Sequence, residues 1–238
     1  MKRKFTVVLL TLCLSLSISS QIFAESANEP VLVETTKVDL NNGAKSVNPK
    51  LYTLNEYLDD GHTVYAFQDI PVESRVQAFD YLKNKIANAQ PETVVDTGGA
   101  TGQFSGNDYN TDSRTTDAAV YTHSTINVSL AFFNTTITST GGMSGGWFGS
   151  GSPSKIVLNQ SATYNGVSVT VSWPASMTGT PTSKTWVSQP ITNSNPAGAS
   201  HSSLTATALG FTSVTFSDVA DIYLGSQIYR PTSYLKFD

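Results

Sequence analysis

The stretch Thr125-Ile126-Asn127-Val128-Ser129-Leu130-Ala131-Phe132 places a large apolar residue at every second position and small or polar residues between them. This period of two is typical of a β-strand that buries one face and exposes the other. The stretch lies within residues 118–217, where only Lys155 and Lys184 carry a formal charge and 36 positions are Ser or Thr. The large apolar residues there are mostly Val, Ile, Phe, Tyr and Trp, which suit a pleated, half-buried surface. The segment therefore predicts a compact all-β domain.

Similar short runs follow towards the C-terminus, between Gly, Pro and Asn residues that favour turns. Asn165-Gly166 is typical of a type I′ turn, so we expect a hairpin there. Glycines dominate 141–151, and the composition of 174–183 and 193–202 also favours loops. We predict an antiparallel β-sandwich of roughly seven to nine strands in 118–238. The β region is expected to begin near Ala118, with strands over 125–140, 156–163, 167–173, 185–191, 204–209, 211–217 and 222–229.

A smaller segment, 25–92, precedes this domain and is expected to be a leader followed by a short helical region. Strands are predicted at 31–33 and 64–67, and Thr53-Leu54-Asn55-Glu56 matches a capping box at the start of a helix. The clearest helix lies between Pro71 and Pro91, which are suited to its first turn and to its end. Its apolar stripe contains Val72, Val76, Phe79, Leu82 and Ile86. Residues 93–117, rich in Gly, Asn, Asp and Thr, predict a long loop or linker.

The first 24 residues have the pattern of a secretory signal peptide. Three basic residues, Lys2, Arg3 and Lys4, precede an apolar run that is shorter than the ~20 residues a spanning helix needs. We expect cleavage after Ala24 and release of the mature chain from the cell. Cys13, the only cysteine, lies within the signal, so the mature chain cannot form a disulfide or a thiolate metal site. Lipid attachment at Cys13 is disfavoured because Leu12 precedes it.

The charge and apolar pattern of the mature chain argue against nucleic acid as a partner and against a transmembrane anchor. It would hold 11 basic and 18 acidic residues, a net charge of −7, which gives no electrostatic reason to expect nucleic-acid binding. No second apolar stretch is long enough to act as a transmembrane anchor. These properties suggest an extracellular partner, such as a polysaccharide or another component of a cell surface.

Asp108, Asn110 and Asp112 have the spacing of the first ligands in a calcium-binding loop. Hard oxygen ligands at alternate positions can converge on one ion where the backbone turns. Ser113 stands where the turn glycine belongs and Ala119 where a bidentate acid is expected, so Asx-turns in a polar loop are the alternative interpretation. Calcium is the single cofactor that the sequence proposes.

Trp147 and Phe148 stand within the glycine-rich segment, where strand packing is not expected to bury both rings. Aromatic rings displayed on loops can stack on sugars or contact proteins, so this pair is the predicted ligand-binding contact. A loop that folds back over the end of the domain is the alternative.

No catalytic residue is assigned from the sequence. Ser144 lies in a G-x-S-x-G pattern, but an activated serine also needs a nearby base, for which His123 and His201 are the candidates. Three functions remain. The first is a secreted, non-enzymatic binding or matrix protein, and the second is a secreted hydrolase whose site is assembled from distant residues. The third is a β-pore-forming toxin, suggested by the charge-free alternation over 125–140.

Overall fold

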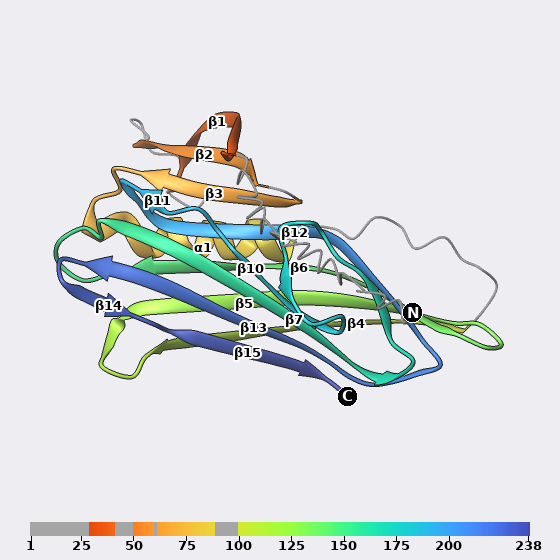
Figure 1. The fold of residues 1–238 in the computed structure, drawn as a ribbon. Coiled ribbons are helices and arrows are strands. Elements are labelled where there is room, and N and C mark those ends of the chain that lie inside the picture. The colour runs from red at the N-terminus through yellow and green to blue at the C-terminus, as the bar shows by residue number, and fades with distance from the viewer. Residues whose placement is uncertain (1–28, 41–49, 60, 89–99) are drawn as a thin grey trace, which may run out of the picture.

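The computed structural model describes residues 29–40, 50–59, 61–88 and 100–238. The predicted signal peptide and its cleavage site lie outside these residues. The described chain is mainly β, with two antiparallel sheets and one short α-helix in its N-terminal part (Figure 1). The prediction of a mainly β fold that follows a small helical segment is confirmed at this level.

The first sheet has eight strands in the order β1-β2-β3-β12-β6-β5-β4, and β8 also pairs with β12. Strands β1 to β3 and β4 to β6 are each consecutive in the chain, and β12, from a later part, lies between these two groups. Its strands are β1 (Val31–Asp39), β2 (Leu51–Asp59), β3 (His62–Gln68), β4 (Ala100–Asp112), β5 (Thr115–Leu130), β6 (Thr135–Trp147), β8 (Thr170–Ser172) and β12 (Ser194–Ala208).

The second sheet has seven strands in the order β14-β13-β7-β10-β9, with β11 also paired with β7 and β15 with β13. Its strands are β7 (Lys155–Val167), β9 (Thr178–Gly179), β10 (Ser183–Val187), β11 (Ile191–Thr192), β13 (Gly210–Leu224), β14 (Gln227–Tyr229) and β15 (Thr232–Phe237). The long β7–β13 ladder, which runs from Lys155–Tyr223 to Val167–Gly210, is the backbone of this sheet.

One hydrophobic core lies between the two sheets and takes residues from both. Val120, Met143 and Ala199 contribute from the first sheet, and Leu158 and Phe216 from the second. The sheets approach closely where their facing residues are small. A Cβ atom at Gly145 of β6 would lie 2.4 Å from the Cβ of Ala220 in β13. The glycines therefore permit contact between the sheets.

A second, smaller core lies between the helix and the other face of the first sheet. The 3₁₀ turn η1 (Val72–Ser74) leads into α1 (Arg75–Ala87), whose Leu82 and Ile86 pack against Leu54 and Phe67. The predicted helix is confirmed, but its stripe is rotated. Val72 and Val76 are exposed, while Arg75 and Ala78 are buried. Among the described residues, no helix is long and apolar enough to cross a membrane.

Several segments that predict loops or a helix are strands instead. The capping-box residues 53–56 lie in β2, most of the expected 93–117 linker forms β4, and the glycine-rich residues 141–146 belong to β6. Residues 194–202, expected as a loop, begin β12. The predicted hairpin at Asn165-Gly166 is also wrong. Both residues continue β7, where the Nδ2 of Asn165 donates to the Oγ of Ser213 over 3.1 Å.

Candidate functional site

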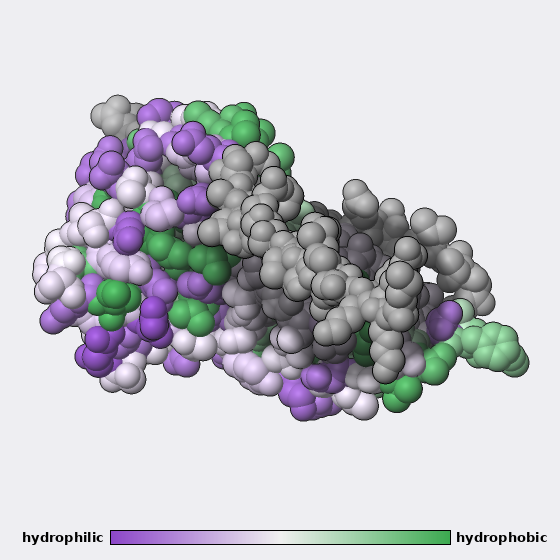
Figure 2. All heavy atoms as spheres, in the orientation of Figure 1, coloured by the Kyte–Doolittle hydropathy of each residue, from purple (hydrophilic) through white to green (hydrophobic). Residues whose placement is uncertain are grey.

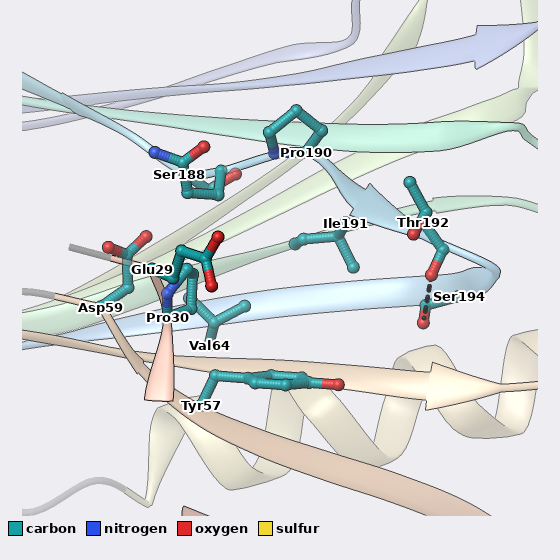
Figure 3. Close-up of a pocket in the computed structure, with 11 residues that line it drawn as sticks. Glu29, Pro30, Tyr57, Asp59, Val64, Ser188, Pro190, Ile191, Thr192 and Ser194 are labelled. Carbon is teal, nitrogen blue, oxygen red and sulfur yellow. Dashed lines mark hydrogen bonds between the residues drawn. The ribbon is translucent and has the colours of Figure 1, made fainter. Parts of the chain in front are cut away.

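A cleft of about 660 Å³ opens beside the core, between β2 and β3 of the first sheet and the segment that leads from β10 into β12 (Figure 3). Its lining combines one tyrosine ring, two carboxylates, several hydroxyl or amide groups and a few apolar side chains. The lining residues are Glu29, Pro30, Tyr57, Asp59, Val64, Ser188, Gln189, Pro190, Ile191, Thr192 and Ser194. A concave site with a few converging polar groups is the usual form of a small-molecule site.

The β2–β3 hairpin positions the tyrosine and one carboxylate. Tyr57 is paired with Val64 and Asp59 with His62, and Gly61 has a φ of 80° that glycine readily adopts in the turn. The hydroxyl of Tyr57, which is half-buried, accepts a hydrogen bond from Asn55 Nδ2 over 3.2 Å. Asn55 in turn accepts from Thr35 Oγ1 over 2.9 Å. The ring is therefore held in place from the outer strands.

The opposite wall is fixed to the second sheet by hydrogen bonds. Ser188 exchanges two bonds with the backbone of Leu158, donating through its N–H over 2.9 Å and accepting at Oγ over 3.0 Å. Ile191 and Thr192 form β11 against β7, and Ser194 Oγ donates to the Thr192 carbonyl over 3.1 Å, as Figure 3 shows. This wall is therefore largely preformed.

The polar groups of the cleft are acidic and neutral. Glu29 is exposed and Asp59 is buried, and no lysine or arginine lines the cleft among the described residues. In Figure 3 the two carboxylates lie to one side of the Tyr57 ring, with Thr192 and Ser194 to the other. Such a lining disfavours an anionic ligand. It provides acceptors for hydroxyl groups and an aromatic ring for an apolar face.

The three predicted calcium ligands do not come together in the structure. Asp108, Asn110 and Asp112 occupy alternate positions of the extended strand β4, where side chains on one face are spaced along the strand. Asp108 accepts from the Tyr234 N–H over 2.8 Å, and Asn110 donates to the Thr232 carbonyl over 2.8 Å. Within the described ranges, no group of three or more His, Cys, Asp or Glu residues could hold a metal ion.

Asp112 forms an ion pair instead. Its carboxylate accepts from Arg114 Nε over 2.9 Å and from the N–H of Arg230 over 2.6 Å. These contacts, chiefly the one with the Arg114 side chain, hold the pKa of Asp112 well below its ordinary value. The calcium interpretation depends on a turn at residues 108–112. These residues lie instead in strand β4, which pairs with β5.

The predicted aromatic contact is not displayed to solvent. Trp147 ends β6 and is only 5% exposed, and its indole Nε1 donates to the Ser150 carbonyl over 2.9 Å. Phe148 is half-buried, with its ring edge-to-face on Phe79 of α1 at 5.2 Å between centroids. Arg75 fixes the following loop by donating to the Gly149 and Gly151 carbonyls. Trp147 is therefore buried at the end of a strand rather than displayed on a loop, whereas Phe148 remains partly accessible.

Of the serine and histidine candidates, Ser144 and His201 are buried and His123 is half-buried. Ser144 is fully buried within β6, in a strand rather than at a strand-to-helix turn. His123 is half-buried in β5, and its pKa is lowered by burial. His201 is buried near His62, with ring centroids 6.3 Å apart.

The cleft escaped the sequence analysis because its residues come from separated segments and no motif joins them. Tyr57 and Asp59 lie more than a hundred residues from the 188–194 wall. Tyr57 lies opposite the buried Val64 in the β2–β3 pair. The two residues become neighbours only through this strand pairing, which the sequence alone does not show.

Comparisons with known proteins leave the family of the chain open. No protein-family model matches it, and no curated protein matches it. Among solved structures, domain G2 of mouse nidogen-1 is similar over 88% of this chain and 89% of its own, with 11% identity and a TM-score of 0.19. So weak a likeness carries no argument about fold or function.

Proposed function

We propose that this protein is an exported, non-enzymatic binding protein whose cleft takes a neutral saccharide from a polysaccharide or a cell surface. The observation that carries the proposal is the lining of the cleft. The Tyr57 ring, two carboxylates and the hydroxyl groups of Ser188, Thr192 and Ser194 line one cleft. A sugar ring has an apolar C–H face suited to an aromatic surface, and hydroxyl groups that donate to carboxylates.

The architecture is consistent with such a role. We interpret the two sheets, which share one core, as a β-sandwich, a rigid support that can hold a binding site at its edge. Both walls of the cleft are tied to these sheets by hydrogen bonds, so little ordering would be needed on binding. The absence of a lining cation among the described residues makes a neutral ligand a better fit than an anionic one.

The experiment is a glycan array followed by titration calorimetry with the saccharide that binds. Tyr57→Ala is expected to weaken binding by ten- to a hundredfold, roughly the effect of losing a central aromatic contact of 1–3 kcal/mol. Tyr234→Ala is the matched control, since Tyr234 is an exposed tyrosine on β15, away from the cleft. The control should bind like the wild type.

Two results would count against this proposal. One is an absence of binding to every neutral glycan on the array. The other is equal loss of affinity in Tyr57→Ala and Tyr234→Ala, which would place the contact elsewhere.

A second candidate is a secreted glycoside hydrolase, favoured by the presence of Glu29 and Asp59 in one cleft. Most glycosidases use a pair of carboxylates, one as acid and the other as base or nucleophile. Turnover of a bound glycan that is abolished by both Glu29→Gln and Asp59→Asn would establish this candidate over the binding protein. Binding without turnover would support the first proposal.

A further inference from the structure

The turn between β5 and β6 exposes two phenylalanine rings at one end of the molecule. Phe132 is 92% exposed and Phe133 75% exposed, and their rings meet edge-to-face with centroids 4.5 Å apart. The alternation of 125–132 predicts a buried Phe132, but the strand ends at Leu130 and the ring points away from the core. Neither ring contributes to the hydrophobic cores of the described residues.

Folding of the hairpin does not account for these rings. Ala131 and Asn134 close a two-residue loop with backbone hydrogen bonds of 2.8 and 3.3 Å. Neither Phe132 nor Phe133 has a positive φ, so the backbone of this turn does not explain the choice of these residues. A Phe-Phe pair is neither a usual turn sequence nor a core element, so its exposure calls for a contact outside the chain.

The rings belong to a larger apolar surface at this end, which we call the tip. The neighbouring turns expose Leu209 and Val167, whose backbones are joined by a 3.0 Å hydrogen bond. Leu130, also exposed, lies beside an apolar cleft of about 400 Å³ that reaches between the sheets to Phe211. Figure 2 shows hydrophobic atoms projecting at the end of the molecule where, in Figure 1, the β5–β6 hairpin turns.

We propose that the tip docks this protein on a lipid bilayer by inserting its apolar side chains into the interfacial region, without spanning the bilayer. The two most exposed residues of the tip, Phe132 and Phe133, offer roughly 300–400 Å², whereas a stable protein interface usually needs about 800 Å² per partner. A bilayer requires only that a few apolar side chains enter and that no charge accompanies them. The hairpin meets the second condition, since residues 118–147 contain no lysine, arginine, aspartate or glutamate. In the adjoining cleft, the charged lining residue is Asp238, which pairs with Lys236.

The depth of contact is limited by the strands behind the tip. Beyond the Leu130–Thr135 pair, the loop extends about two residues on each side, a reach of roughly 7 Å. This reach is about the depth to which apolar side chains enter the boundary between lipid headgroups and acyl chains. A spanning hairpin needs about ten residues in each strand, but here these residues are paired on both sides, β5 with β4 and β6 with β12.

The test is flotation of the purified mature protein with neutral phosphatidylcholine vesicles. The wild type is expected to float with the vesicles, and Phe132→Ser/Phe133→Ser is expected to reduce the bound fraction on the order of tenfold. Phe132→Leu/Phe133→Leu, which keeps the apolar surface, should retain binding. Since the chain is acidic and no basic cluster marks the tip, anionic lipid should not strengthen binding.

The matched control is Leu32→Ser/Val33→Ser on the edge strand β1, where both side chains are also exposed. It should float like the wild type. Failure of the wild type to float would overturn the proposal, as would equal losses in the tip and control variants. A wild-type dimer that the tip variant converts to a monomer would assign the tip to a second copy of the chain. Release of entrapped dye would replace docking by pore formation.

This proposal is independent of the saccharide site. Ser194 of the cleft begins β12, whereas Ala208 at the other end of that strand pairs with Thr135 next to the tip. Loss of vesicle binding in the tip variant should therefore leave glycan binding unchanged, and Tyr57→Ala should leave flotation unchanged.

Discussion

Replacing Asp218 by asparagine is expected to stabilise the folded chain at neutral and alkaline pH and to change its stability little near pH 4. Asp218 lies in β13, between Gln160 of β7 and Ser233 of β15, and its side chain is completely buried. Neither carboxyl oxygen has a hydrogen-bond partner of ordinary length among the described residues. Burial raises the pKa of Asp218 from 3.8 to about 8, and the polar groups of Thr122 and Gln160 oppose this shift only in part.

The sign and size of the effect follow from these two pKa values. Between about pH 4 and about pH 8 the folded state keeps a proton that the unfolded chain releases, so the free energy of unfolding falls as the pH rises. One pKa unit corresponds to about 1.4 kcal/mol, which gives about 6 kcal/mol over the whole interval. This value is an upper limit, because relaxation and water entry reduce the energy of burying a charge. Asparagine removes the ionisation and should recover a few kcal/mol at about pH 8.

The assay is urea unfolding of both proteins at about pH 4, 6 and 8. The difference between their free energies of unfolding should grow steadily with pH. Asp80→Asn, which removes an exposed carboxylate from α1, is the control and should change stability by less than about 0.5 kcal/mol at each pH. If the curves of the wild type and Asp218→Asn run parallel, the buried acid does not titrate as described.

Three further substitutions and one control test the contacts that hold the fold together. Arg75→Met should lower the free energy of unfolding by about 2–4 kcal/mol, because it removes the charged donor of two part-buried hydrogen bonds to the Gly149 and Gly151 carbonyls, and Trp147 fluorescence should shift to the red. Gly142→Ala should destabilise by about 1–3 kcal/mol or more, since its Cβ would lie 2.2 Å from a backbone oxygen, whereas Gly210→Ala meets no atom within 4 Å and should be nearly neutral. Asp112→Asn should cost about 1–3 kcal/mol at neutral pH. Because the folded pKa of Asp112 is depressed, this loss should begin to shrink as the pH falls below about 4 and should vanish only near the much lower pKa of the folded state.

The sequence predicts those strands and helices in which the spacing of apolar residues within one segment marks the buried face. Ile126 and the alternation around it lie in β5, and Phe79, Leu82 and Ile86 lie on the buried face of α1. In both cases the apolar residues repeat with the period of the element, and the partner surface need not be known. Val31-Leu32-Val33 also lies in a strand, as predicted.

Residues that usually favour loops were misleading where a neighbouring strand decides the conformation. Gly142 is in a strand because β6 pairs with β12, and the close backbone of Ala199 leaves no room for a side chain there. Asn165 continues β7 because β13 supplies its backbone and side-chain partners. Asp108 and Asn110 bond to β15 rather than to a metal. Each of these outcomes depends on a contact more than 40 residues away, which local propensity does not contain.

The two candidate sites differ in how far the sequence could have indicated them. The cleft forms only where β2 and residues 188–194 lie side by side in the fold. No spacing of residues in the sequence indicates that contact. The tip was within reach, because Phe132-Phe133 precedes an Asn-Thr-Thr run at the end of an alternating strand. It was missed because the alternation was extended through Phe132 and the turn carries no glycine or proline.

The saccharide proposal is tested most directly by backbone amide NMR during titration with the glycan that the array selects. Binding in the cleft predicts chemical-shift changes concentrated at Tyr57–Asp59 and 188–194, with the amides of the tip unchanged. Saturation of these shifts should give the same dissociation constant as calorimetry. Shifts confined to the tip, or an absence of shifts at saturating glycan, would contradict the assignment of the cleft as the binding site.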